Sequence, residues 1–247
     1  MGSSALCAVP SSEGGEYAMS TLATPVKAAG GAQGLRQRVA DRAWYAYAAR
    51  LLPLAEAGRW VDLGCGQGEF LELAQGVGAK GFGLDFSPHN ALAVRRDARP
   101  AVVADLNRPL PFRDHSLDGA SLIEVIEHIV HAEDLLQELS RVIRPGGWLV
   151  LTTPNVAHLT YRWRALTGHP PKQEGYHYRF FTKKTLRQGL ERAGFRLVGR
   201  ASFGKQSLAT KLGRLAGRGR NYKFRYQVPA ALEGLFAQHF VWRLERI

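Results

Sequence analysis

Three glycines spaced two residues apart, Gly64, Gly66 and Gly68, follow a short apolar stretch within Arg59–Phe70, which reads R-W-V-D-L-G-C-G-Q-G-E-F. Residues 60–63 carry Trp, Val and Leu side chains that favour a β-strand. Because glycine has no Cβ, the turn that follows can adopt positive φ and lie against a ligand. Helix-forming residues come next. The stretch therefore predicts a strand, a glycine loop and a helix, an arrangement that binds nucleotides at the carboxyl end of a parallel strand.

The spacing of these glycines excludes two common nucleotide-binding loops. A dinucleotide fingerprint, G-x-G-x-x-G, needs glycine at the position of Glu69, and a phosphate-binding loop needs Gly-Lys followed by Ser or Thr. Neither is present. A G-x-G-x-G loop alone is also compatible with an ordinary strand-to-helix turn, so the rest of the chain has to identify the ligand.

A second acid is predicted at the tip of a neighbouring strand. Gly81–Asp85 reads as a strand that ends in Asp85, with Ser87 as the N-cap of the next helix. Asp85 lies nineteen residues beyond Gly66. An acid at this place can accept hydrogen bonds from both hydroxyls of a ribose. A carboxylate that only caps the helix is the alternative.

Three more strands follow in order. Ala101–Leu106 reads as the third strand, with Asp105 at its end, and Gly119–Ile123 reads as the fourth. Residues 132–143 carry apolar side chains at helical spacing and stop at R-P-G-G, after which 148–152 reads as the fifth strand. The chain therefore alternates strands and helices, as parallel α/β sheets do.

These ordered motifs resemble those of the class I S-adenosylmethionine-dependent methyltransferases. The matching features are an acid and G-x-G-x-G at the first strand, acids at the next two, and the run S-L-I-E-V-I-E-H followed by R-V-I-R-P-G-G-W-L-V-L-T-T-P-N. The run is similar to the small-molecule group that includes the ubiquinone-type O-methyltransferases. Together the matching motifs cover about residues 59–200.

The resemblance implies S-adenosylmethionine as the cofactor and S-adenosyl-L-homocysteine as its product. In that family the glycine loop packs against the amino-acid and ribose parts of the cofactor, and the second acid binds the ribose. The third acid accepts a hydrogen bond from the adenine amino group, and the backbone of the next residue meets the ring. The predicted cofactor-binding residues are Asp62, Gly64, Cys65, Gly66, Gly68, Asp85, Phe86, Asp105, Leu106, Ile123 and Glu124.

The predicted fold class is α/β, Rossmann-like, with a seven-stranded, mostly parallel sheet and helices on both faces. A period-two pattern at 240–247 predicts an antiparallel last strand. We expect a disordered N-terminal extension at 1–33 and a single methyltransferase domain at 34–247. Within that domain, 155–180 is predicted as a substrate-wall insertion and 201–235 as a basic insertion.

A helix with three aromatic residues is expected ahead of the first strand. The spacing of apolar residues suits a helix over 35–54, and Trp44, Tyr45 and Tyr47 lie in its middle. We expect these rings to cap the sheet. A role in covering the substrate is the alternative.

Charge and cysteine content bear on partners and compartment. The formal net charge is +12, and ten Lys or Arg but no Asp or Glu fall between Arg192 and Leu232. The basic segment 205–225 is interpreted either as an amphipathic helix suited to an anionic membrane surface or an acidic substrate, or as a solvated basic loop. Cys7 and Cys65 lack the spacing of a disulfide or metal site, which fits a reducing cytoplasm. We predict a cytoplasmic protein, with peripheral membrane contact through the basic segment as the consequence of the first of these interpretations.

His128 is the candidate catalytic residue. It follows the fourth strand, and an imidazole titrates near neutral pH, so it can accept a proton from the methyl acceptor. A histidine that only caps is the alternative. Glu124, Glu127 and His128 also stand at i, i+3 and i+4, and one helical turn would place them on one face. The resemblance to ubiquinone-type enzymes implies a divalent metal there, but many relatives with other substrates share these letters, so no metal is predicted.

The sequence thus predicts a methyltransferase that acts on an oxygen of a small or lipid-like metabolite. An RNA methyltransferase is an alternative prompted by the basic segment, but nucleic acid is not favoured because Thr153-Pro154-Asn155 stands where base-methylating enzymes carry N-P-P-Y and no separate RNA-binding module is recognised. A non-catalytic partner that keeps the cofactor fold for binding is the third hypothesis.

Overall fold

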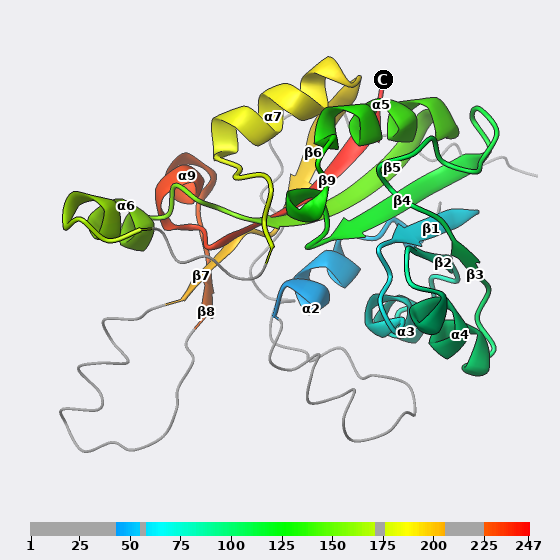
Figure 1. The fold of residues 1–247 in the computed structure, drawn as a ribbon. Coiled ribbons are helices and arrows are strands. Elements are labelled where there is room, and N and C mark those ends of the chain that lie inside the picture. Colours follow the sequence, from blue (N-terminus) through cyan, green and yellow to red (C-terminus); the bar gives the residue numbers. More distant parts are fainter. Residues whose placement is uncertain (1–42, 55–57, 171–175, 206–224) are drawn as a thin grey trace, which may run out of the picture.

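The computed structural model describes residues 43–54, 58–170, 176–205 and 225–247. Within these ranges the chain forms one nine-stranded sheet with helices on both faces (Figure 1). The strands are β1 (Trp60–Leu63), β2 (Phe82–Asp85), β3 (Ala101–Val103), β4 (Leu117–Ile123), β5 (Ile143–Pro154), β6 (Phe195–Arg200), β7 (Phe203–Lys205), β8 (Arg225–Gln227) and β9 (His239–Arg246).

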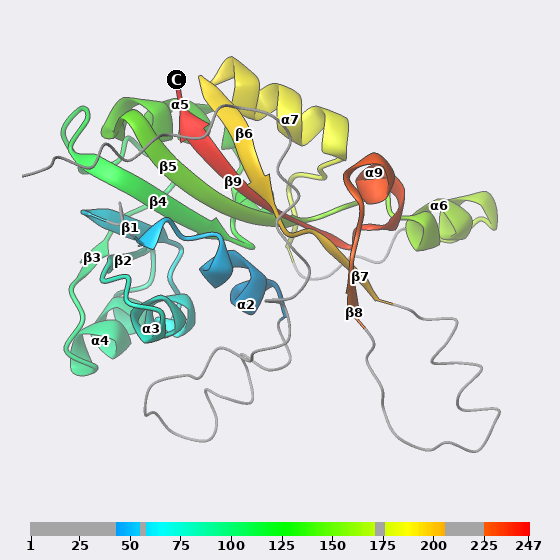
Figure 2. The same ribbon diagram turned by 180° about the vertical axis from the view of Figure 1, so that it is seen from behind.

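The helices cover the two faces of the sheet in two groups, which Figures 1 and 2 show from opposite sides. Helices α2, α3 and α4 lie on one face, and α5 and α7 lie on the other. The helical segments are α2 (Ala43–Arg50), α3 (Glu69–Gly76), α4 (Pro88–Arg96), η3 (Ile126–His128), α5 (Ala132–Val142), α6 (Leu159–Leu166), α7 (Lys183–Arg192), η4 (Ala230–Leu232) and α9 (Glu233–Phe236).

Each face has its own apolar core because each helix turns one stripe of apolar residues toward the sheet. On the α5 and α7 side, Leu135, Leu139 and Leu186 are buried in one cluster with the sheet. On the opposite side, Trp60 and Phe70 are buried in a second cluster with residues of α2 and α4. The predicted helices on both faces are confirmed.

Five strands pair in parallel in the order β3-β2-β1-β4-β5. Their carboxyl ends therefore meet at the same edge of the sheet. The order reverses at β1, since the chain passes outward to β2 and β3 and then returns to β4 on the other side. Ligands of open α/β sheets bind at such a switch point, which places the glycine loop after β1 at the expected position.

The last strand, β9, is antiparallel to β5 and β6, as predicted. Its bounds are His239–Arg246 rather than 240–247. Pro154 at the end of β5 pairs with His239 at the start of β9. Because β9 runs in the opposite direction, its first residue lies at the edge where the parallel strands end.

The described sheet has two strands more than the seven predicted. β7 and β8 form an antiparallel pair, and Phe203 in β7 also pairs with His239. The extension 1–33 and residues 206–224 of the basic segment, with the expected amphipathic helix, lie outside the described residues. Of the helix expected over 35–54, the described part is α2.

Several element bounds differ from the sequence predictions. β3 ends at Val103, so Asp105 is not the last residue of a strand. Its Oδ1 accepts a hydrogen bond from the Asn107 backbone N–H at 2.9 Å, a local turn that competes with the strand ladder. β4 begins at Leu117, two residues before the predicted start, and α5 ends at Val142, one residue before the predicted end.

The fifth strand is longer than predicted because it includes R-P-G-G. β5 begins at Ile143, which pairs with Leu117, and the register shifts before Gly119 pairs with Trp148. Gly146 has φ of 73°, and a Cβ on Gly147 would lie 2.7 Å from the Asp118 carbonyl oxygen. The glycines therefore let an irregular strand pass close to its neighbour instead of ending the ladder.

The described residues include no helix long and apolar enough to cross a membrane.

A fully buried carboxylate ties α9 to the sheet. Glu233 has no exposed surface, and its Oε1 accepts hydrogen bonds from the Ser202 hydroxyl and from Trp242 Nε1, the latter at 2.7 Å. Its Oε2 lies 3.3 Å from Lys183 Nζ at the start of α7. One side chain thus joins α7, α9, β9 and the turn before β7.

We expect Glu233→Ala to lower the free energy of unfolding by about 3 kcal/mol, because it leaves buried donors of Ser202 and Trp242 unpaired. Glu191→Ala is the matched control, since it removes an exposed i,i+4 pair with Arg187 and should change stability by no more than about 0.5 kcal/mol. Urea unfolding measures both. Equal effects of the two substitutions would contradict the role given to Glu233.

Candidate functional site

The glycine loop after β1 has the backbone conformation that its composition predicts. Gly64, Gly66 and Gly68 have φ of 66°, 54° and 88°, values that favour glycine. The Gly64 and Cys65 backbone N–H groups both donate to the Leu84 carbonyl oxygen, at 2.7 and 3.0 Å. A Cβ on Gly64 would lie 2.6 Å from Val125 Cγ2. The loop is therefore anchored to β2 and packed against the residues that follow β4.

Asp85 joins the glycine loop to the second strand. Its Oδ2 accepts a hydrogen bond from the Gly66 N–H at 2.8 Å. Its Oδ1 accepts from the Ser87 N–H at 2.8 Å and from Asn90 Nδ2 at 3.0 Å. Ser87 is the N-cap of α4, as predicted. The carboxylate thus holds the loop and the start of α4 together. Asp85 therefore contacts the first turn of the helix, as the capping alternative expected, and it also lies at the edge where a ligand would bind.

Asp62 is buried beneath the loop. It is 2% exposed, and its Oδ1 accepts a hydrogen bond from the Ser121 hydroxyl at 2.6 Å across the β1–β4 pair. Burial, with smaller contributions from the nearby carboxylates of Glu69 and Asp85, raises the pKa of Asp62 to about 7. The same burial raises the pKa of the Cys65 thiol, so Cys65 is not an activated nucleophile.

The loop fits the cofactor that the sequence resemblance implies. A Cβ on Gly66 would have only the Glu69 carboxylate near it, at 3.4 Å, so one side of this backbone is open to a ligand. Phe86, after β2, is 73% exposed and can lie against a ring, whereas Leu106 and Ile123 are buried. The predicted cofactor residues therefore come from the ends of β1, β2 and β4 and from the turn after β3.

Glu124, directly after β4, has φ of 56°, an unusual conformation for a residue with a side chain. Its N–H contacts the carbonyl and hydroxyl oxygens of Thr152, and its Oε1 accepts from that hydroxyl at 2.8 Å. Its Oε2 lies 2.9 Å from His239 Nδ1. Positive φ at a non-glycine residue costs free energy, so its neighbours hold Glu124 at this strand end.

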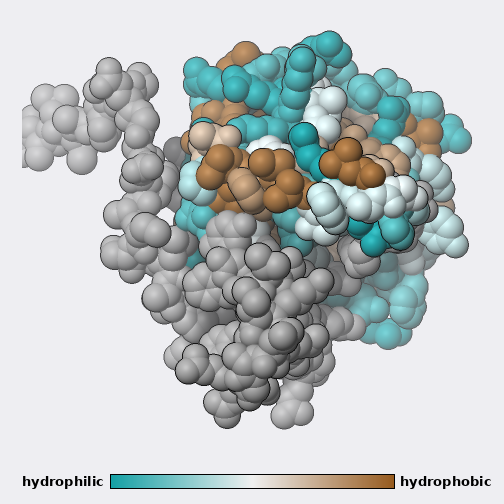
Figure 3. Space-filling view, turned by 90° about the vertical axis from the view of Figure 1, so that its left-hand side faces the viewer, coloured by the Kyte–Doolittle hydropathy of each residue, from teal (hydrophilic) through white to brown (hydrophobic). Residues whose placement is uncertain are grey.

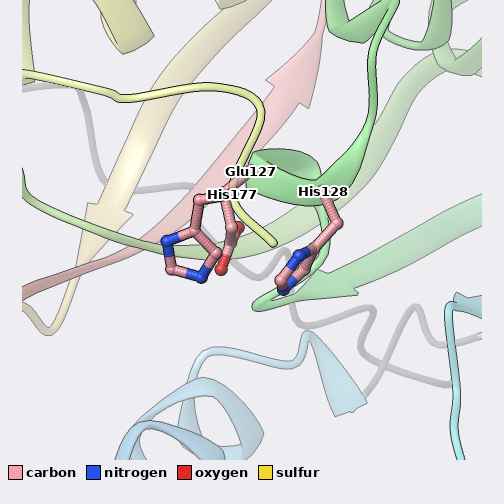
Figure 4. A group of neighbouring side chains, drawn as sticks. All are labelled: Glu127, His128 and His177. Atoms are coloured by element: carbon pink, nitrogen blue, oxygen red, sulfur yellow. The ribbon is translucent and has the colours of Figure 1, made fainter. Parts of the chain in front are cut away.

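The prediction that one helical turn contains Glu124, Glu127 and His128 is wrong for Glu124. The short 3₁₀ helix η3 begins at Ile126, so Glu124 lies outside it. Glu127 and His128 come together instead with His177, from the segment before α7 (Figure 4). One ligand atom from each of these three side chains lies within 4.8 Å of the others.

This group combines a buried carboxylate with two imidazoles. Glu127 is 2% exposed, and its Oε2 accepts from the Thr153 hydroxyl at 3.0 Å. Burial, and secondly the charge of Glu124, raise the pKa of Glu127 well above its ordinary value. His128 Nδ1 lies 2.9 Å from the Tyr176 carbonyl oxygen, which can only accept, so this contact places the proton on Nδ1 and leaves the Nε2 lone pair available.

Two residues of this edge, His239 and Phe203, were missed by the sequence analysis, whereas Trp44 was expected to cap the sheet. Trp44 of α2 stacks on His239 with ring centroids 4.4 Å apart, and Phe203 lies on the same imidazole at 5.8 Å. The period-two pattern of the last strand could have indicated His239. The first residue of a strand antiparallel to the others lies at the edge where the parallel strands end. Trp44 thus caps the sheet through His239, beside Glu124.

The insertion after β5 is anchored by a neutral histidine. His158 is the N-cap of α6, and its Nδ1 accepts from the Thr160 N–H at 3.2 Å. Burial lowers the pKa of His158. A buried neutral imidazole that accepts a backbone hydrogen bond starts α6 and does not act as a proton acceptor there.

A family model described as a methyltransferase domain matches residues 36–199. The chain is 38% identical over 130 residues to the trans-aconitate 2-methyltransferase of Methylobacterium nodulans, an alignment that covers 49% of this chain and 48% of that protein. It is 31% identical over 120 residues to the demethylmenaquinone methyltransferase of Desulfitobacterium hafniense, covering 44% and 47%. The chain thus spans about half the length of these curated relatives.

Among solved structures, a SAM-dependent methyltransferase from Archaeoglobus fulgidus is similar with a TM-score of 0.61 and 20% identity. The alignment covers 87% of this chain and 100% of that chain. Similarity at this level of identity shows the same Rossmann-like fold.

We expect Asp62→Asn to change how stability depends on pH. The carboxyl group ionises near pH 4 in the unfolded chain and near pH 7 in the folded one, so the free energy of unfolding of the native protein should fall as pH rises between these values. The variant keeps an oxygen for Ser121 and has no charge to bury. It should therefore gain stability relative to the native protein, by on the order of 3 kcal/mol at pH 8.

Urea unfolding from pH 4.5 to 8 without added ligand measures this difference. Asp97→Asn is the control, because Asp97 is more than half exposed and its substitution should leave the pH dependence unchanged. A constant difference between native protein and Asp62→Asn across this range would show that Asp62 is not held in its neutral form.

Proposed function

Because the chain belongs to the class I S-adenosylmethionine-dependent methyltransferases, we propose that it transfers a methyl group from S-adenosylmethionine to an oxygen of a small or lipid-like acceptor. The observation that carries the proposal is the Gly66 N–H to Asp85 hydrogen bond. It joins an open glycine loop to an acid at the tip of the neighbouring strand, and a site that binds a nucleoside uses both.

In this proposal, Gly64 to Gly68 lie against the amino-acid and ribose parts of the cofactor, and Asp85 accepts from the ribose hydroxyls. Asp105 and Leu106 meet the adenine, and Phe86 lies against the ring. The bound cofactor supplies a methyl group already activated by the positive charge on sulfur. The protein therefore has to align the acceptor and exclude water.

The acceptor oxygen forms a bond to the methyl carbon as the carbon–sulfur bond breaks, and the acceptor loses its proton. We assign that proton, in the metal-free protein, to Nε2 of His128. The contact of Nδ1 with the Tyr176 carbonyl supports this role, because it orients the ring and keeps the Nε2 lone pair available.

A small or lipid-like acceptor is supported by exposed apolar residues beyond β5. Leu159, Trp163 and Leu166 are 46%, 67% and 81% exposed, and they share one face of α6 at i, i+4 and i+7. Figure 3 shows hydrophobic residues gathered on this side of the molecule. The relatives named for trans-aconitate and demethylmenaquinone support a small-molecule acceptor. The face of α6 and the basic sequence 205–225 also support peripheral contact with an anionic membrane.

We expect the protein to bind S-adenosyl-L-homocysteine, and Asp85→Ala to weaken that binding by at least about tenfold, since it removes a charged acceptor and releases the Gly66 N–H. Asp97→Ala, an exposed acid just beyond α4, should bind as the native protein does. Isothermal titration calorimetry measures all three proteins. Absence of binding to the native protein would overturn the proposed function.

Incubation with methyl-labelled cofactor and a cell extract should label a product of low molecular mass. His128→Gln should reduce the rate of labelling by about 100-fold or more, because no side chain then takes the proton from the substrate hydroxyl. Cofactor binding should persist. Fractionation of the extract, followed by mass spectrometry of the labelled fraction, identifies the product. Label in the RNA fraction would instead favour the nucleic-acid alternative.

A further inference from the structure

The segment that carries His177 is held against η3 by three hydrogen bonds on both sides of that residue. His128 Nδ1 lies 2.9 Å from the Tyr176 carbonyl oxygen. The Glu127 carbonyl oxygen accepts from the N–H groups of Tyr178 and Arg179, at 2.9 and 3.0 Å. Tyr176, before His177, is therefore tied to the His128 side chain, and the two residues after His177 are tied to the Glu127 backbone. His177 is placed beside these two residues by this local structure.

The three side chains offer a complementary set of donors. Glu127 is a buried carboxylate, and no Lys or Arg within the described ranges lies at ion-pair distance from it. His128 uses one ring nitrogen for the Tyr176 carbonyl, the partner that fixes the other nitrogen as a metal ligand in many proteins. The imidazoles of His128 and His177 lie edge to face with centroids 4.8 Å apart. A cation would stabilise the ionised form of this buried carboxyl group, and the two neighbouring imidazoles offer further ligand atoms.

Glu124 is directed elsewhere, although it shares the E-x-x-E-H sequence. Its two carboxylate oxygens contact the Thr152 hydroxyl at 2.8 Å and His239 Nδ1 at 2.9 Å. It also lies outside η3, with positive φ. The ligand set at this place therefore differs from the one that spacing in the sequence suggests.

We propose that Glu127, His128 and His177 bind a divalent transition-metal ion, with Glu124 outside its coordination sphere. One carboxylate and two imidazoles suit Zn²⁺ or another borderline ion, whereas Mg²⁺ and Ca²⁺ prefer oxygen ligands only. Ligand atoms around Zn²⁺ are about 3.5 Å apart, so small side-chain rotations from the present spacing of up to 4.8 Å complete the site. Three protein ligands leave positions open for water or an acceptor oxygen.

An ion here would have a consequence for methyl transfer that rests on the proposed function. An ion held by Glu127, His128 and His177 would supply Lewis-acid chemistry that lowers the pKa of a nearby acceptor hydroxyl. With an ion bound, His128 would be a ligand and could not also accept the proton of the methyl acceptor. Ion binding itself does not depend on methyl transfer.

The test is calorimetric titration of the chelator-treated full chain with ZnCl₂ alone. We expect the native protein to bind one ion with a dissociation constant of about 1 μM or below, and excess MgCl₂ to leave this affinity unchanged. His177→Ala and His128→Ala should each weaken binding by about 30-fold or more. Glu124→Gln is the matched control, since it lies three residues from Glu127 in the same motif, and it should bind within about threefold of the native protein.

Absorption of the Co²⁺-loaded protein provides a second readout that does not depend on activity. Visible bands of a nitrogen- and oxygen-coordinated site should appear in the native protein and in Glu124→Gln, and be absent in His177→Ala. Retention of the thermal midpoint shows that each variant is folded, and retained S-adenosyl-L-homocysteine binding is a second check for the two histidine variants.

Absence of Zn²⁺ binding to the native protein would overturn the proposal. Native affinity in His177→Ala, or an equal loss in Glu124→Gln, would overturn the ligand set. Failure of the native protein to bind S-adenosyl-L-homocysteine would instead count against the proposed function alone, because that binding does not involve these three side chains.

Discussion

The hydrogen bond between the Gly66 N–H and the Asp85 carboxylate organises the ligand edge of this protein. The same carboxylate accepts from Ser87 and Asn90 at the start of α4. A single acid therefore sets the path of the glycine loop, the tip of β2 and the first turn of a helix. Because these groups satisfy one another, the loop has a defined shape before any ligand arrives, and binding need not order it.

The carboxyl edge of the sheet also gathers buried carboxyl groups whose ionised forms are unfavourable. Burial raises the pKa of both Asp62 and Glu127, and each is close to another carboxylate. Such groups cost stability in their ionised form and become favourable when a cation binds. A sulfonium cofactor that carries an ammonium group, and a divalent ion at Glu127, are ligands that would convert this cost into binding free energy.

Much of this edge could be predicted from the chain alone, because strand tips are read from local patterns. The spacing of Gly66 and Asp85 indicated two neighbouring tips, and the structure joins them directly. The bounds of β3 and β5 could not be predicted as well. Asp105 forms a local turn with Asn107, and R-P-G-G continues in the strand because its glycines fit close to β4. Both outcomes depend on competition between local hydrogen bonds and the sheet.

The sequence by itself determined the order of strands and helices, the glycine loop, the acids near the strand ends and the antiparallel last strand, since each follows from residue type at short spacing. Tertiary structure alone decided the partners of Glu124 and Glu127. They are three residues apart, yet a positive φ turns one toward Thr152 and His239, while hydrogen bonds from a distant segment bring His177 to the other. Such contacts between remote segments depend on how loops pack at the carboxyl edge of the sheet, which no local pattern contains.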